Sequence, residues 1–139
     1  MLFNNNDTEY PTSVSSINIP STVTSIGDFT FKEDKSLISI TIPPTVTTLS
    51  DCVFAECVTL QSINHPPTLI SLGDGVFGYC SSLTSISLPP TLTILGRDLF
   101  WRCGSLKSIT LPPTVLTLGN SVFYGCKSLI SIPLSPDLI

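Results

Sequence analysis

The feature that most constrains this chain is a repeat with a period of 23 in the residue numbering. Phenylalanine recurs at that interval, and a cysteine follows three positions after each of the last four phenylalanines. Leucine, isoleucine and paired prolines keep the same interval. A period of about 20–50 residues is typical of stacked repeat architectures. The rows are Phe31, Phe54, Phe77, Phe100 and Phe123; Cys57, Cys80, Cys103 and Cys126; Leu37, Leu60, Leu83, Leu106 and Leu129; Ile17, Ile40, Ile63, Ile86, Ile109 and Ile132; and the proline pairs at 43–44, 66–67, 89–90 and 112–113.

Each unit predicts one short strand. Residues 83–88 follow the pattern L-x-x-L-x-L, and their alternation places Ile86 and Leu88 on one face and two serines on the other. The proline pair then ends the strand, because proline has no N–H to donate. The return path is too short for a full helix and predicts an extended or 3-10 segment. Six strands are expected, starting near Val14, Leu37, Leu60, Leu83, Leu106 and Leu129.

The unit resembles the BspA-like class of leucine-rich repeat. The matching motif is Cys80-x-Ser82-Leu83-x-x-Ile86-x-Leu88-Pro89-x-x-Leu92-x-x-Leu95-Gly96-x-x-Leu99-Phe100-x-x-Cys103. The resemblance covers about residues 13–138. It implies a mainly β leucine-rich-repeat arc, with a parallel concave sheet of about six strands and short convex segments. We expect a short polar leader over 1–12 and a single repeat domain over 13–139.

Composition and charge exclude several classes of partner. Only 12% of residues are charged and the net charge is −4, which argues against nucleic acid, because binding phosphates needs a basic face. No apolar run approaches the roughly 20 residues that span a bilayer. The first residues lack the basic and apolar regions of a signal peptide. The family resemblance nevertheless implies a cell-surface protein, with the cytoplasm as the alternative.

Cysteine and histidine are the residues most able to carry chemistry. The odd count of five cysteines disfavours a fully paired disulfide framework, and the row of four is expected to be free and buried in the core. His65, the only histidine, occupies the inward position held by Ile42, Leu88 and Leu111. It has no partner for nucleophilic catalysis. We therefore predict no enzyme activity, catalytic residue, metal site or cofactor.

The outward positions of the strands form one candidate binding face. Small hydroxyl residues recur there, beside a row that varies between repeats, on the concave sheet by which leucine-rich repeats usually bind. An alternative is that small hydroxyls merely suit a solvated parallel sheet. The candidates are Ser39, Thr41, Gln61, Ser62, Asn64, Thr84, Ser85, Ser87, Lys107, Ser108 and Thr110.

The two positions after each phenylalanine form a second candidate face. Stacking at a period of 23 would place Trp101 beside Tyr124, and Tyr79 beside Arg102. Tryptophan, tyrosine and arginine are the residues enriched at binding hot spots. The alternative is that they only cover the outer edge of the core.

The sequence therefore predicts a non-catalytic, adhesive repeat module that binds a protein of unknown identity. The alternative is a structural spacer within a longer repeat array. No helix is predicted to cap either end of the stack, so we also expect a homodimer through the uncapped repeat ends.

Overall fold

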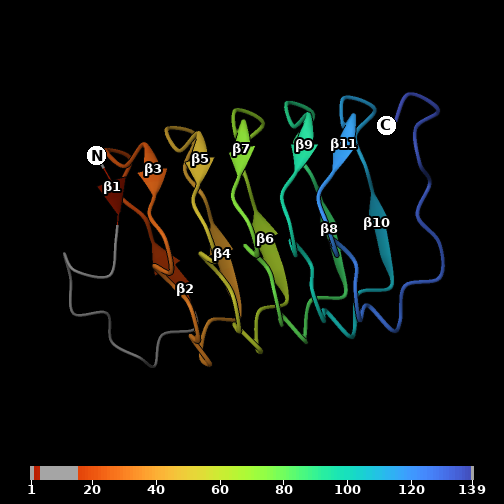
Figure 1. Ribbon diagram of the computed structural model, residues 1–139. Coiled ribbons are helices and arrows are strands. Elements are labelled where there is room, and N and C mark those ends of the chain that lie inside the picture. The colour runs from red at the N-terminus through yellow and green to blue at the C-terminus, as the bar shows by residue number, and fades with distance from the viewer. Residues whose placement is uncertain (1, 4–15, 139) are drawn as a thin grey trace.

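The computed structural model describes residues 2–3 and 16–138, which form a parallel β-solenoid without helices in that part of the chain. Successive turns lie side by side in chain order (Figure 1). Between residues 16 and 118 each turn contributes a three-residue strand and, opposite it, a two-residue strand. The predicted fold class is confirmed. The predicted leader lies mostly outside the described residues, and the division into leader and repeat domain stays a prediction.

Parallel pairing joins equivalent residues of consecutive repeats. In the first row Ile17 pairs with Ile40, and Ile40 with Ile63. In the second row Leu2 and Phe3 of β1 pair with β3. The three-residue strands are β2 (Ser16–Asn18), β4 (Ser39–Thr41), β6 (Ser62–Asn64), β8 (Ser85–Ser87) and β10 (Ser108–Thr110). The two-residue strands are β1 (Leu2–Phe3), β3 (Ser25–Ile26), β5 (Thr48–Leu49), β7 (Ser71–Leu72), β9 (Ile94–Leu95) and β11 (Thr117–Leu118).

Five of the six strands expected from the L-x-x-L-x-L pattern are present. The sixth expected segment, residues 129–134, has no assigned strand, and Ile130 on it is 90% exposed. The reason is local: Pro133 has no N–H to donate to a ladder.

The core between the two strand rows is a stack of repeated apolar side chains. The rings of Phe54 and Phe77 lie 5.9 Å apart with planes 2° from parallel, and those of Phe77 and Phe100 lie 5.5 Å apart at 10°. Leu60, Leu83 and Leu106 are fully buried beside them. The repeated rows of the sequence are therefore the core, because stacking repeats of equal length brings identical side chains into contact.

A third ladder joins the turns at the phenylalanine row. The N–H of Phe54 donates to the carbonyl of Val76 at 2.9 Å, and the N–H of Phe77 donates to that of Leu99 at 3.0 Å. These segments consist of consecutive turns rather than 3-10 helix. The backbone groups of the return path are thus satisfied by the next repeat.

Candidate functional site

The outward side of β2, β4, β6, β8 and β10, called the serine face below, is exposed as expected. In β4, β8 and β10 the central isoleucine is buried and both neighbours are exposed. All eleven candidates predicted on this face are exposed. A shallow hollow lies over β6, β8 and β10, lined by Ser62, Ser85 and Ser108 among others. The face is polar and carries one charged candidate, Lys107.

His65 lies where the strand ladder is interrupted. Among the described residues no pairing joins β6 to β8, or β7 to β9. His65 is half-buried, and its Nε2 lies 2.8 Å from the carbonyl oxygen of Ser87 in the next repeat. A carbonyl only accepts, so Nε2 carries the proton of this bond. The imidazole bridges the two repeats, while the Phe77 and Phe100 stack continues beside it.

The aromatic cluster is defined as Tyr79, Trp101, Arg102 and Tyr124. The structure brings together the two pairs that the spacing predicted, Trp101 with Tyr124 and Tyr79 with Arg102, and adds contacts of Trp101 with Tyr79 and with Arg102. The rings of Tyr79 and Trp101 meet edge to face at 4.8 Å and 75°, and those of Trp101 and Tyr124 lie 6.3 Å apart. The Cζ of Arg102 is 5.3 Å from the centre of the Trp101 ring and 5.8 Å from that of Tyr79. Such cation–π contacts hold the guanidinium against the rings.

The backbone of this row is left-handed. Tyr79 has φ 60° and Arg102 has φ 57°, whereas the equivalent residue of the next repeat is Gly125 with φ 76°. The left-handed region favours glycine and costs other residues roughly 1–2 kcal/mol. Two side chains of the cluster therefore stand at positions where glycine would be less strained.

A groove runs beside the cluster toward the C-terminal repeats. It encloses about 600 Å³ and is lined by Tyr79, Arg102, Gly104, Tyr124, Gly125 and Lys127. Tyr124 is 59% exposed. The sequence interpretation identified the rings and Arg102 but missed Lys127 and the two glycines as parts of a groove.

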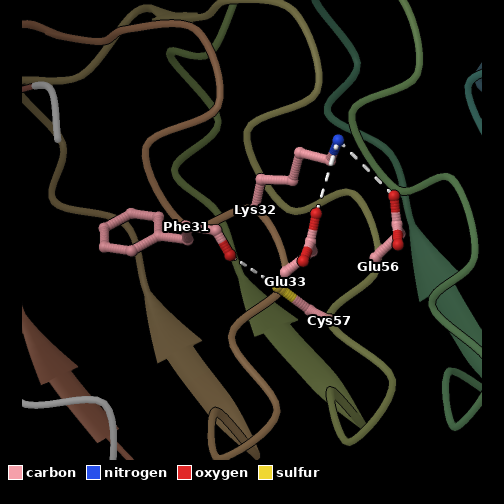
Figure 2. A network of polar contacts seen from close by, with 5 residues as sticks. All are labelled: Phe31, Lys32, Glu33, Glu56 and Cys57. Carbon is pink, nitrogen blue, oxygen red and sulfur yellow. Dashed lines mark hydrogen bonds and ion pairs between the residues drawn. The ribbon is translucent and has the colours of Figure 1, made fainter.

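The same row is acidic in the N-terminal repeats. Figure 2 shows Lys32 between two carboxylates, with Nζ 3.6 Å from Glu33 and 3.5 Å from Glu56. Glu33 and Glu56 occupy the left-handed positions equivalent to Tyr79 and Arg102. The row therefore changes along the solenoid from acidic to aromatic and basic.

The cysteine row is buried and hydrogen-bonded. Each thiol donates to the carbonyl of a phenylalanine 26 residues earlier, as Cys57 does to Phe31 at 3.0 Å (Figure 2) and Cys103 to Phe77 at 3.0 Å. All five cysteines are free. Burial raises the pKa of Cys57 and of Cys103 to about 12. These thiols are core donors, and the described residues hold no group of three or more His, Cys, Asp or Glu that could bind a metal.

An aspartate ladder is a feature that the sequence interpretation missed. The Oδ1 of Asp51 accepts the N–H of Asp74 at 2.8 Å, and the Oδ1 of Asp74 accepts the N–H of Arg97 at 2.7 Å. A glycine precedes both Asp74 and Arg97 and lets the backbones of neighbouring repeats approach closely. A Cβ on Gly96 would lie 2.7 Å from the carbonyl oxygen of Gly73. The sequence does contain a signal for this ladder, because Asp28, Asp51 and Asp74 recur at the period of 23.

The stacked parallel strands, the buried repeated rows and the exposed variable faces define a leucine-rich-repeat solenoid. More narrowly, the chain belongs to the BspA type leucine-rich repeat region family, which it matches in six copies over residues 5–130. No curated protein matches the chain by sequence. In the described residues no helix is long and apolar enough to cross a membrane.

Solved structures with the same fold come from bacteria. A leucine-rich repeat protein of T. pallidum is 29% identical with a TM-score of 0.84, over 89% of this chain and 60% of that one. A leucine rich cell surface protein of Faecalibacterium prausnitzii is 30% identical with a TM-score of 0.85, over 88% of this chain and 33% of that one. The pneumococcal vaccine antigen PcpA, 19% identical with a TM-score of 0.77 over 92% of this chain and 33% of that one, shares the fold. This chain thus spans less than two thirds of the first neighbour and about a third of the other two.

Proposed function

We propose that this chain is a non-catalytic, adhesive module that binds a protein partner, at the cell surface. One observation carries the proposal: the phenylalanines, leucines and cysteines that recur at the period of 23 are buried or half-buried, whereas the row that varies between repeats, Ile38, Gln61, Thr84, Lys107 and Ile130, is exposed. A fixed frame with variable exposed side chains is how repeat proteins present binding surfaces. The cell-surface neighbour from F. prausnitzii supports the location by similarity.

The serine face and the aromatic cluster are the two surfaces through which binding would occur. The serine face offers small donors and acceptors along five strands. The aromatic cluster offers the residue types that contribute most to protein interfaces.

The proposal assigns no catalytic role to His65. Its Nε2 lies 3.4 Å from the hydroxyl of Ser87, a contact that resembles that of a nucleophile and its base. The same nitrogen already donates to the carbonyl of Ser87 at 2.8 Å, so it has no lone pair with which to accept the hydroxyl proton.

A binding assay on two matched double variants tests the proposal. The chain is immobilised and titrated with purified extracellular-matrix and serum proteins. Ser85→Arg with Ser108→Arg blocks the serine face, and Trp101→Ala with Tyr124→Ala removes two rings of the aromatic cluster. We expect saturable binding of at least one protein, abolished by one double variant and retained by the other. Binding that neither variant changes, or no saturable binding, would contradict the proposal.

The alternative is a spacer within a longer repeat array. It is favoured by one observation, that the chain spans only 60% and 33% of two structural neighbours. A spacer would bind nothing on either face, so the same assay separates the two functions.

Self-association through the repeat ends belongs to the proposed interactions. The last described turn, which includes residues 129–138, lies beyond β10 and β11 at the end of the stack, with Ile130 and Leu134 exposed (Figure 1). Such an end can pair with a second copy. Sedimentation velocity at micromolar concentration is expected to give a dimer, and a monomer at all concentrations would exclude this contact.

A further inference from the structure

Two cations line the groove beside the aromatic cluster, and neither forms an ion pair with a carboxylate of the described residues. The groove contains Arg102 and Lys127 and no Asp or Glu. The ion pairs found in the described residues, those of Lys32, lie in the acidic repeats instead. Arg102 is oriented by the faces of Tyr79 and Trp101, and no described carboxylate forms an ion pair with its guanidinium. Its charge is therefore available to an external anion.

The charge of the chain is distributed unevenly along the solenoid. Residues 16–80 carry six acidic and two basic side chains, a net charge of −4, whereas residues 81–138 carry four basic and two acidic ones, a net charge of +2. An acidic ligand is repelled by the first half and attracted to the second. Complementary charge of this kind speeds encounter and fixes orientation.

The backbone of the next repeat leaves room for the side chain of Arg102. The left-handed conformation of Arg102 is shared by Glu33, Glu56 and Tyr79 at the equivalent positions, so it belongs to the repeat. Gly125 leaves space for the arginine, since a Cβ there would lie 2.9 Å from the Cγ of Arg102.

We infer that this groove docks an acidic peptide segment of a protein partner, with Arg102 and Lys127 binding its carboxylates and Tyr124 packing against its side chains. The guanidinium fork matches a carboxylate with two parallel hydrogen bonds. The exposed Tyr124 ring supplies apolar area, and the open floor at Gly104, where a Cβ would meet nothing within 4 Å, leaves room for a chain to pass. A groove open to solvent suits an extended segment better than an enclosed small molecule. This inference rests on the proposed function and specifies its partner.

Trp101 is the only tryptophan, and its ring contacts Arg102 and the two tyrosines of the groove, so its emission reports on the groove through them. The probe is a tryptophan-free synthetic peptide of glutamates with two phenylalanines, labelled for anisotropy and unlabelled for Trp101 emission. A lysine peptide with the same phenylalanines and a uronic-acid oligosaccharide serve as comparisons. We expect saturable binding of the glutamate peptide alone, weakening as salt screens the two cations.

Three variants locate the binding site of the peptide, each compared only after its urea midpoint has been found equal to that of the unchanged chain. Arg102→Gln is expected to weaken the peptide about fivefold or more, Arg102→Lys less, and Lys127→Gln about threefold, as exposed charge pairs do. Lys107→Gln removes the same charge on the serine face and is expected to leave the affinity unchanged.

Several results would overturn the inference. They are full affinity in Arg102→Gln, equal weakening by Lys107→Gln, equal binding of the lysine peptide, or tighter binding of the oligosaccharide. If any of these occurs while the protein panel still binds through the serine face, the inference is wrong and the proposed function stands. If the panel binds nothing, the proposed function fails independently of the peptide result.

Discussion

Removing one ring from the phenylalanine stack perturbs the interior of the solenoid directly. Phe77 is 2% exposed and lies between the rings of Phe54 and Phe100, at 5.9 and 5.5 Å. Deleting a buried phenyl ring costs about 3–5 kcal/mol, part of which is the loss of two stacked contacts at roughly 0.5–1.5 kcal/mol each. We expect Phe77→Ala to lower the free energy of unfolding by about 4 kcal/mol. Phe77→Leu, which keeps most of the volume, is expected to cost about 1–2 kcal/mol.

Phe123→Ala is the matched control. Phe123 is half-buried and has one stacked neighbour in the described residues, Phe100 at 5.7 Å. It is expected to cost about 2 kcal/mol, because less apolar area leaves the core. Urea unfolding followed by Trp101 emission measures all three, and an unchanged m-value shows that stability alone has changed. If Phe77→Ala lowers the free energy of unfolding by less than about 1 kcal/mol, or by no more than Phe123→Ala does, the conclusion that the phenylalanine stack is buried in the core is wrong.

Three further predictions follow from single contacts. Gly96→Ala should destabilise the fold by more than about 2 kcal/mol, since a Cβ at Gly96 would meet backbone at 2.7 Å. Gly104→Ala should destabilise it by less than about 0.5 kcal/mol, since a Cβ at Gly104 would meet nothing within 4 Å. Equal thermal midpoints of the two variants would contradict this. His65→Leu, which places the residue of the next two repeats at this position, should stabilise by about 1 kcal/mol, because burial of the leucine contributes more than the imidazole hydrogen bond that is lost, and a lower urea midpoint would refute it. Burial raises the pKa of Cys57 and Cys103 from 9.0 to about 12, so folding favours the protonated thiols. Their contribution to the free energy of unfolding should therefore be intact below pH 9 and lost as pH rises toward about 12. Alkylation at pH 8 should modify the half-buried Cys52 first, and rapid modification of all five cysteines would exclude the buried row.

The period of 23 was enough to predict five strands, the buried rows and the contact of Trp101 with Tyr124, because stacking converts equal spacing into contact. It could not give conformation within a repeat. The left-handed backbone at Tyr79 and Arg102 has no signal in their side chains, and only Gly125 at the same position hints at it. Lys127 was missed for another reason, since it joins the groove from the turn after Cys126.

The interruption between β6 and β8 was also beyond the sequence argument. The position of His65 was assigned correctly, but a periodic pattern treats every repeat as equivalent. Whether an imidazole replaces a ladder hydrogen bond depends on the distance to one carbonyl, that of Ser87. The aspartate ladder was missed although Asp28, Asp51 and Asp74 keep the period of 23, because the spacing alone does not show that their carboxylates accept backbone N–H groups of the next repeat.

Amide hydrogen exchange tests the stacked architecture most directly. The N–H groups of Phe54, Phe77 and Phe100 donate to the next repeat at 2.9, 3.0 and 2.9 Å, whereas in the described residues no backbone bond joins the N–H of Thr84 to the repeat before it. We expect these three phenylalanine amides to be among the slowest to exchange, with a protection pattern that recurs from one repeat to the next and the amide of Thr84 exchanging fast. Phenylalanine amides that exchange as fast as that of Thr84, with no recurrence between repeats, would contradict the stacked solenoid.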